Sequence, residues 1–343
     1  MRAPSRWFSL RFPLTPGRWG RGRAAFLRGL LAGLLCGLTV AGAAPAQSPF
    51  QIELRLLGRP LTAGQQATVR EAARQVSGLI ASPFVPVRVN IPAGDCDRRL
   101  PAVQGTVRNL IVFVVVRDLG DDVYATGMPC DLQDRTYLPI YGVVDLNSRG
   151  LTDLPRVDLL DTMLHELLHV LGVGTLWEAD SRVSRNGETD GRSFIRRDGR
   201  SLVYTAPRAV AAYRALGGRG RGIPLDPDGG HWDGRAVCAE ILSGSAGNFT
   251  GRVNPVSPVT LAALEDLGYR VNLLAASRYA LPRGSCAAQL RDGSGPLWVP
   301  TGGFAGCAAA RSAGATLPLR RGEPAYRPEL DGDGDGLACE GGR

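Results

Sequence analysis

TMLHELLHVLGVGTLW, residues 162–177, is the stretch that decides how the rest of the chain is interpreted. Apolar residues recur at helical spacing from residue 157 to 173, which predicts a helix that ends near Gly172. Residues four apart lie on the same face of a helix, so His165 and His169 can both offer an imidazole to one ion. The question is whether HELLH is a metal site or a chance match.

The chemistry of zinc fits these side chains. Zinc takes nitrogen ligands at about 2 Å in tetrahedral geometry, and a catalytic site leaves one position for water. Glu166, next to the first histidine, is placed to take a proton from that water as a general base. Five-residue matches of this kind also occur by chance on ordinary amphipathic helices, so a metal site needs a third ligand elsewhere in the chain.

We expect the third ligand to be His231. The chain contains three histidines, and the third lies in the glycine-flanked loop GGHWDG at residues 229–234, where a backbone can approach a metal closely. Glu188 follows His169 by 19 residues (188 − 169), but its polar, glycine-containing surroundings have no helical pattern. Thr175 stands where the compact HExxHxxGxxH pattern has its third histidine, so that pattern does not apply.

Asp161 lies one turn before His165 and allows two interpretations. It either supports that histidine through a hydrogen bond, or it is an exposed charge favoured by the positive end of the helix dipole. The sequence favours the exposed charge.

The pattern of the other elements predicts an α+β fold. Strands are expected at residues 51–58, 85–91, 109–118 and 137–147, and helices at 61–81, 157–173, 205–218 and 257–271. The apolar, β-branched run at 109–118 is typical of a central strand, whereas 137–147 is expected at an edge of the sheet. Residues 178–200 are rich in Arg, Asp and Gly and predict a long surface loop.

Residues 1–46 predict an export signal. They contain seven arginines and no acids, and an apolar run leads to the cleavage-like site Ala44-Pro45-Ala46. An uncleaved anchor is the alternative, but the apolar run is rich in glycine, so removal is favoured. Subtracting these seven charges from the net charge of +8 leaves +1, and no nucleic-acid partner is expected. The mature protein is expected to be soluble and secreted or extracytoplasmic, at the cell envelope.

Six of the seven cysteines lie outside the export signal, and an even number in an exported chain predicts disulfides. They form no CxxC pair, which argues against a cysteine-ligated zinc. Six cysteines allow many connectivities. Chain order and domain placement favour the pairs Cys96–Cys130, Cys238–Cys286 and Cys307–Cys339.

HELLHVLG and its surroundings resemble the leishmanolysin family of zinc metallopeptidases, in particular its secreted bacterial relatives. In that family HExxHxxG is followed by a long insertion before the third histidine, and here the gap from His169 to His231 is 62 residues (231 − 169). YTAPRAVAAYRALGG, GGHWDG, AEILSG and SPVTLAALEDLGYRVN occur in the family's order. The resemblance covers roughly residues 100–275.

The resemblance implies that His165, His169 and His231 bind Zn²⁺ and that Glu166 is the general base. It implies a secreted zinc-dependent endopeptidase that hydrolyses protein or peptide substrates with zinc-activated water. The implied fold is a metzincin-like zincin fold, with a twisted sheet over the active-site helix. Leu242 is a departure, because the family has a methionine at this position; leucine has a similar volume, so packing is expected to be kept.

The C-terminal tail carries a second pattern. Asp331, Asp333 and Asp335, followed by Gly336, match the start of an EF-hand loop, in which oxygen ligands converge on Ca²⁺. Glu340 is the nearest following carboxylate, but it comes two residues too early for the bidentate glutamate of that loop. The tail is therefore not an ordinary EF-hand.

Residues 304–340 instead resemble the excalibur domain, a small extracellular calcium-binding module that ends in DxDxDGxxCE. The resemblance makes Cys307 available to pair with Cys339. Such a small module has too little core to stand alone, so a disulfide and a bound ion make physical sense.

The 343 residues therefore divide into a signal peptide (1–46), a leishmanolysin-like peptidase domain (47–277), a linker (278–300) and an excalibur-like domain (301–343). We expect a monomer that can associate with the cell envelope through its tail. One alternative is a non-catalytic, envelope-associated metal-binding scaffold protein; Glu166, which decayed peptidases tend to lose first, favours the enzyme. The other alternative is a metal-dependent hydrolase whose substrate is not protein.

Overall fold

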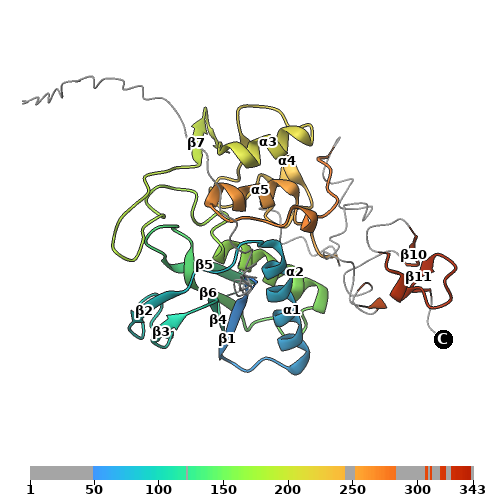
Figure 1. Ribbon diagram of the computed structural model, residues 1–343, viewed down its shortest axis with the longest axis horizontal. Coiled ribbons are helices and arrows are strands. Elements are labelled where there is room, and N and C mark those ends of the chain that lie inside the picture. Colours follow the sequence, from blue (N-terminus) through green and yellow to red (C-terminus); the bar gives the residue numbers. More distant parts are fainter. Residues whose placement is uncertain are drawn as a thin grey trace, which may run out of the picture. The chain divides into compact units, whose positions relative to one another are not determined.

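Figure 1 shows the computed structural model of the chain. It describes residues 49–120, 123–243, 252–282, 306–307, 310, 317–321 and 326–340. The expected signal peptide, most of the expected linker and Cys286 lie outside the described residues. Among the described residues, no helix has the length and apolar composition needed to cross a membrane.

A four-stranded sheet forms the core of residues 49–282, with the strand order β1-β4-β6-β5. Its strands are β1 (Ile52–Gly58), β4 (Leu110–Arg117), β6 (Pro139–Asn147) and β5 (Ala125–Leu132). β1, β4 and β6 are parallel, and β5 pairs antiparallel with β6. β4 and β6 are buried along almost their whole length, as strands in a covered parallel sheet are.

The central position predicted for β4 is confirmed, whereas the edge position predicted for β6 is wrong. The edge belongs to β5, which the sequence did not predict as a strand. Its sequence ATGMPCDL includes Gly127 and Pro129, two residue types that are depleted in strands. Proline is tolerated at an edge because no ladder hydrogen bond is lost there.

Helix α1 (Ala63–Leu79) packs against β1 and begins, as predicted, shortly after residue 61. A capping box defines its start: the Thr62 hydroxyl accepts from the Gln65 N–H at 3.2 Å, and the Gln65 side chain accepts from the Thr62 N–H at 2.9 Å. The helix lies beside α2 under the sheet (Figure 1).

Helix α2 (Arg156–Val170) carries HELLH and packs against α1, β5 and β6. It ends where the sequence predicted, and Gly172 follows with φ +105°. β5 lies directly on its backbone, because a Cβ at Gly127 would be 2.3 Å from the Glu166 carbonyl oxygen. Only glycine permits this approach of the edge strand to the helix.

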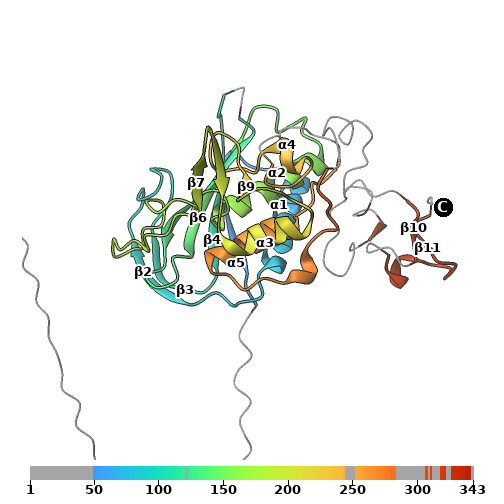
Figure 2. The same cartoon turned by 90° about the horizontal axis from the view of Figure 1, so that it is seen from above.

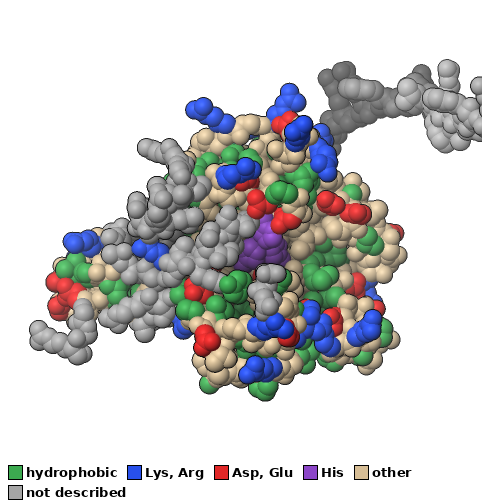
Figure 3. All heavy atoms as spheres, turned by 180° about the vertical axis from the view of Figure 1, so that it is seen from behind, with side chains coloured by type: hydrophobic (Ala, Val, Ile, Leu, Met, Phe, Trp, Pro, Cys, Tyr) green, Lys and Arg blue, Asp and Glu red, His purple; other side chains and the backbone are tan. Residues whose placement is uncertain are grey.

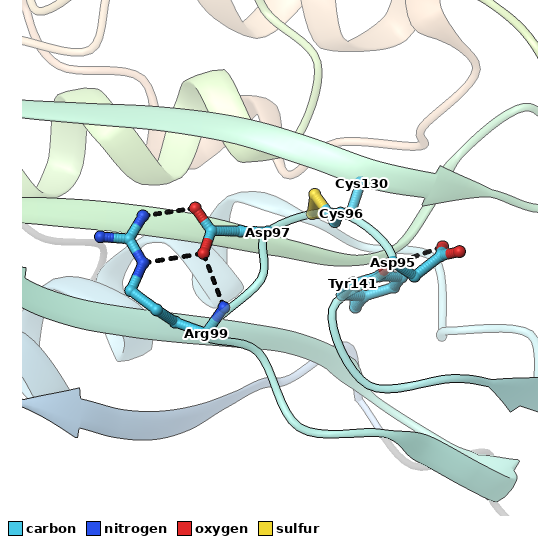
Figure 4. Close-up of a disulfide and its surroundings, with 6 residues drawn as sticks. All are labelled: Asp95, Cys96, Asp97, Arg99, Cys130 and Tyr141. Carbon is cyan, nitrogen blue, oxygen red and sulfur yellow. Dashed lines mark hydrogen bonds and ion pairs between the residues drawn. A yellow bond between two sulfur atoms is a disulfide. The ribbon is translucent and has the colours of Figure 1, made fainter.

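Strands β2 (Val87–Ile91) and β3 (Val103–Val107) form an antiparallel hairpin. The connection between them carries Cys96, which forms a disulfide with Cys130 of β5 at a Cα–Cα distance of 5.5 Å (Figure 4). This pairing was predicted and is confirmed. It ties the connection covalently to the edge strand that lies on α2.

Residues 178–200 were predicted as a long surface loop. Residues 178–194 contain no helix or strand, as predicted, but residues 195–200 do. β7 (Ile195–Asp198) lies within them and forms a three-stranded sheet with β8 (Ser201–Tyr204) and β9 (Ile223–Pro224). All three strands are short, and β7, with the sequence IRRD, is rich in charge, so its pattern does not stand out from that of a loop.

Arg182, in the same segment, is fully buried. Its Nε donates a hydrogen bond to Asp190 Oδ2 at 2.6 Å. Its guanidinium lies 5.8 Å from the ring centroid of Tyr137 and 5.6 Å from that of Phe194. An arginine that is paired and stacked on aromatic rings can be buried, and the hydropathy pattern does not reveal this.

The remaining helices of this region follow β8 in the chain (Figure 2). They are α3 (Pro207–Ala215), α4 (Gly234–Val237), α5 (Pro258–Leu267) and the 3-10 helix η1 (Leu273–Ala275). α3 packs against α5. Ser257 caps α5 by accepting from the Thr260 N–H at 3.2 Å, and Gly268 ends it in the left-handed conformation.

The tail contains a small two-stranded sheet and one turn of helix. These are β10 (Leu319–Arg320), β11 (Leu337–Ala338) and the 3-10 helix η2 (Pro328–Leu330). Cys307 and Cys339 form the predicted disulfide, with a Cα–Cα distance of 5.2 Å. Cys238 is also disulfide-bonded, and the partner predicted for it, Cys286, lies outside the described residues.

Candidate metal centre

The three histidines of the chain converge on one point. His165 and His169 lie on successive turns of α2, and His231 lies in the loop after β9. Their Nε2 atoms are 3.0 Å apart for His165 and His169, 3.1 Å for His165 and His231, and 3.0 Å for His169 and His231. Figure 3 shows them as one patch that is reached from this face of the molecule.

The other ring nitrogen of each histidine has its own partner. The Nδ1 contacts are His165 to the Ile241 carbonyl at 2.6 Å, His169 to the Val173 carbonyl at 2.8 Å, and His231 to Asp228 Oδ2 at 2.6 Å. Carbonyl and carboxylate oxygens only accept, so each Nδ1 donates its proton and each Nε2 turns a lone pair toward the common point.

Three lone pairs at this separation repel one another unless a cation lies between them. Nitrogens at about 2 Å from one zinc ion in tetrahedral geometry lie about 3.3 Å apart. The Nε2 separations of 3.0–3.1 Å are close to this value, so the three histidines fit the zinc ion that the sequence predicted.

Burial keeps the imidazoles on α2 neutral. His165 and His169 are 8% and 7% exposed. Burial, with the charges of the other two histidines, holds the pKa of His165 well below its usual range. Burial, with the charge of His231, lowers the pKa of His169 to about 4. The neutral form is the one that binds a metal, so no proton has to leave these two rings at neutral pH.

Glu166 lies between the two histidines of α2 and is 7% exposed. Burial raises its pKa to about 8. A dication nearby lowers the pKa of a carboxyl again, because it favours the charged form. A carboxyl whose pKa is near neutrality can take up a proton and release it in one reaction cycle.

Close packing after α2 allows the His231 loop to reach the helix. Gly174 has φ +83°, and a Cβ there would lie 2.1 Å from the Gly230 carbonyl oxygen and 3.0 Å from His169 Nδ1. A side chain at this position would push the loop away. The His231 carbonyl also accepts from the Asp226 N–H at 3.0 Å, which holds the loop in place.

Leu242 stands where the resemblance implies a methionine, and it is fully buried in the turn of residues 240–243. This turn contributes more than apolar packing. The Ile241 carbonyl binds His165 Nδ1, and the Leu242 carbonyl accepts from the Trp232 N–H at 2.9 Å. The backbone of the turn therefore contacts a candidate ligand, whichever apolar side chain it carries.

Both interpretations of Asp161 are wrong. It is 4% exposed, so it is not a surface charge. Its carboxylate accepts from the Asn254 backbone N–H at 2.6 Å and from the Asn254 side chain at 2.9 Å, whereas His165 Nδ1 binds Ile241. Asn254 lies 93 residues away in the chain, and no local pattern indicates such a partner.

Two further carboxylates differ in their relation to the site. Glu188, the alternative third ligand, is exposed and lies outside the histidine group of the described residues. Asp228 was not predicted, although it binds His231. Its signal in the sequence is its position three residues before the histidine, from which a carboxylate can orient an imidazole.

The tail brings three carboxylates together. Asp331, Asp333 and Asp335 have oxygens within 4.8 Å of one another. Asp331 is buried and accepts from the N–H groups of Gly334 and Gly336, each at 2.9 Å. Backbone donors thus hold the first carboxylate of the loop in a fixed orientation.

Glu340 is exposed and is not part of this three-carboxylate group. The negative charges of Asp335, Asp333 and Asp331 nevertheless raise its pKa, so it lies within their field. Tyr326 donates to Asp331 at 2.5 Å from the other side.

Neutral imidazoles that face one point, beside a buried carboxyl, meet the needs of metal-assisted hydrolysis of an amide bond. Fold and site together fit a metal-dependent hydrolase, and the family match identifies the class as a metallopeptidase. Residues 101–288, more than half of the 343, match the family described as Leishmanolysin. The chain belongs to the leishmanolysin family, as its motifs indicated.

Residues 304–340 match the Excalibur calcium-binding domain. No curated protein matches the chain. The two families imply zinc in the histidine site and calcium in the tail, and a peptidase family implies protein or peptide substrates. They also suggest an extracytoplasmic protein.

Proposed function

We propose that this protein is a secreted zinc endopeptidase in which His165, His169 and His231 hold the ion. The convergence of their Nε2 atoms at 3.0–3.1 Å, with each Nδ1 bound to an oxygen, carries the proposal. When bound, zinc polarises the scissile carbonyl and lowers the pKa of water.

Glu166 is the proposed general base. It takes a proton from the attacking water as the new C–O bond forms, and holds that proton on its carboxyl. It then delivers the proton to the amine nitrogen as the C–N bond breaks, so that one water is consumed and Glu166 returns to its starting state. Burial raises the pKa of Glu166, and a bound zinc ion would lower it again, so that the carboxylate can accept a proton and then release it.

The exposed edge of β5 is the proposed binding surface for an extended peptide. β5 pairs with β6 on one side. On the other side its last residue, Leu132, forms a bridge with Ser184, and no strand of the described residues pairs with the rest of β5. Gly127 places it against the backbone of Glu166. An extended peptide can add to such an edge through main-chain hydrogen bonds, which would carry it past the histidines. A sheet over α2 and a long insertion before the third ligand support a metzincin-like fold.

The remaining residues have proposed functions that follow from the same two families. Residues 47–277 would form the peptidase domain and 301–343 the calcium-binding domain. Asp331, Asp333 and Asp335 would supply oxygen ligands to Ca²⁺, and Glu340 would add a fourth carboxylate from its place in their field. Residues 1–46 would direct export.

A non-catalytic scaffold is the second candidate, and the presence of Glu166 disfavours it. The mature chain, residues 47–343, is assayed on unfolded casein with and without a chelator, beside Glu166→Gln and Glu188→Gln. We expect the chelator and Glu166→Gln to abolish cleavage, with zinc retained in Glu166→Gln. The exposed control Glu188→Gln is expected to match the unmodified chain. Full activity of Glu166→Gln would contradict the mechanism, and an unmodified chain that binds zinc without cleaving would support the scaffold.

A further inference from the structure

Glu240 is a buried carboxylate that the proposed reaction does not use. It is 1% exposed and begins the turn of residues 240–243. Its Oε2 accepts from the Leu242 N–H at 2.6 Å, and its Oε1 accepts from the Ser257 N–H at 3.1 Å and the Thr260 hydroxyl at 2.6 Å. A buried carboxylate is costly unless donors surround it, and this one has three donors from two parts of the chain.

The first connection from Glu240 leads to His165. The Leu242 N–H is bound to Glu240, and the Ile241 N–H is bound to the Pro255 carbonyl at 3.0 Å. Fixing the N–H groups on both sides of the Ile241 carbonyl fixes the direction of that carbonyl. It points at His165 Nδ1, 2.6 Å away.

The second connection leads to His231. The Thr260 hydroxyl donates to Glu240 and accepts from the Trp232 indole N–H at 2.9 Å. The Trp232 backbone N–H donates to the Leu242 carbonyl at 2.9 Å. Trp232 directly follows His231 in the chain. Its backbone N–H and its indole N–H therefore bind two residues, Leu242 and Thr260, that also donate hydrogen bonds to Glu240.

We propose that Glu240 is a positioning residue of the metal centre, which couples the orientation of His165 to that of His231. These histidines are 66 residues apart in sequence, and one carboxylate links their supports. The apolar side chain of Leu242 fills space but cannot direct a carbonyl. Glu240 can, because its carboxyl accepts from the Leu242 N–H and also from the Ser257 N–H at the start of α5. The inference rests on the proposed zinc site.

Asp266, on α5, offers a matched control. It is a buried carboxylate and also accepts three hydrogen bonds, from the Arg208 N–H at 3.0 Å, the Ala209 N–H at 2.9 Å and the Tyr204 hydroxyl at 3.2 Å. These donors belong to β8 and α3, and none belongs to the turn of residues 240–243. Replacing Asp266 also disturbs three buried hydrogen bonds, but it leaves the groups that orient the Ile241 carbonyl unchanged.

The experiment compares Glu240→Gln and Asp266→Asn in the full mature chain. Glutamine has the size of glutamate but replaces one acceptor oxygen by an NH₂ group, which then faces a donor. We expect Glu240→Gln to bind zinc about 10- to 100-fold more weakly in competition with a chelator, as loss of a ligand's support does. The absorption bands of the Co²⁺-substituted protein are expected to shift. Asp266→Asn is expected to keep the zinc affinity and the cobalt spectrum of the unmodified chain.

Unchanged zinc affinity and an unchanged cobalt spectrum in folded Glu240→Gln would overturn the inference, and so would equal losses in Asp266→Asn. If Glu240→Gln does not fold, Thr260→Val and Thr260→Ser take its place. Valine breaks the link between Glu240 and Trp232 and is expected to weaken zinc binding, whereas serine keeps the hydroxyl and is expected to restore it. Equal zinc affinity of these two variants would overturn the coupling. If the unmodified chain binds no zinc, the proposed function itself fails, which is a different result.

Discussion

The two candidate metal sites of this protein are assembled in opposite ways. The histidine site takes its third member from 62 residues beyond its second, and its two helical members are buried and neutral. The tail site takes three carboxylates from one short loop at residues 331–335, and Asp333 and Asp335 are exposed. The first depends on distant packing, and the second on local spacing.

This difference matches the chemistry of the two ions. Imidazole nitrogen in a dry site suits zinc, whereas charged oxygens in contact with water suit calcium. No neighbouring part of the sequence holds His231 near α2. The position of the site therefore depends on the oxygen partner of each histidine and on the close approach of Gly174 to the Gly230 carbonyl oxygen. In the tail, the donors to Asp331 lie close to it in sequence: the N–H groups of Gly334 and Gly336 and the hydroxyl of Tyr326.

Removing the distant ligand should have the largest effect. His231→Ala leaves two nitrogens on α2, too few for a stable zinc site, so we expect near-complete loss of bound zinc and of casein cleavage. Calcium binding by the tail should be unchanged. Metal analysis of the dialysed protein measures the bound zinc, and calorimetric titration measures calcium binding by the tail. Retention of one tightly bound zinc would show that His231 is not a ligand.

Glu166→Gln should have the next largest effect. It removes the general base but none of the metal ligands, so we expect kcat/KM for a peptide substrate to fall by about 10²- to 10⁴-fold. Zinc content should stay at the level of the unmodified chain. A loss of activity that is explained by loss of zinc would assign Glu166 a structural function instead.

Asp228→Asn tests the hydrogen bond between His231 and Asp228, the partner that lies near it in the sequence. Asparagine can still accept from His231 Nδ1, but without charge, so we expect zinc affinity to fall by about 10-fold. Chelator competition measures this change. Asp134→Asn, an exposed carboxylate remote from the histidines in the sequence, serves as the control. Equal affinity of the two variants would show that Asp228 is dispensable.

The pH dependence of stability in the metal-free protein should report on the buried groups of the histidine site. The pKa of Glu166 is raised from 4.5 to about 8, so its contribution to stability is present below 4.5 and is lost as the pH rises toward 8. The pKa of His169 is lowered from 6.5 to about 4, so its contribution is present above 6.5 and is lost as the pH falls toward 4. Above pH 6.5 the His169 effect is absent, whereas the Glu166 effect persists toward pH 8, beside that of Asp161, whose pKa burial raises to about 7.

Urea unfolding of the metal-free chain between pH 6.5 and 8 measures the Glu166 effect. We expect the free energy of unfolding to fall with pH more steeply in the unmodified chain than in Glu166→Gln, by at most about 1.4 kcal/mol per pH unit. Parallel curves for the two proteins would show that Glu166 ionises without cost in the folded state.

The smallest effect is expected in the tail. Asp333→Asn removes one exposed carboxylate from the loop, and we expect calcium affinity to fall by about 10-fold or less, because the number of charged ligands tunes affinity. Glu329→Gln, which removes a carboxylate outside the group, is the control. Zinc content should be the same in both variants. A change in zinc content would show that the two sites are not independent.

Much of the framework could be predicted from local pattern. The apolar periodicity of α1, α2 and α5 and the β-branched run of β4 are strong local signals, and the structure confirms these elements. β5 was missed because glycine has a low strand propensity, and Gly127 is explained only by its close contact with α2. The burial of Arg182 was missed because its partners, Asp190 and two aromatic rings, compensate a charge that pattern alone assigns to the surface.

The sequence by itself determined the residue types of the site: HELLH, a single further histidine, and three aspartates spaced by two. These features consist of residue types and their spacing, and the ligand preferences of zinc and calcium indicate which ion each set of residues would bind. Only the tertiary structure decided what holds the histidines, namely the Ile241 and Val173 carbonyls and Asp228, and where the Asp161 and Glu240 carboxylates are bound. Backbone carbonyls carry no sequence signal, and hydrogen bonds across many tens of residues exist only once the chain has folded.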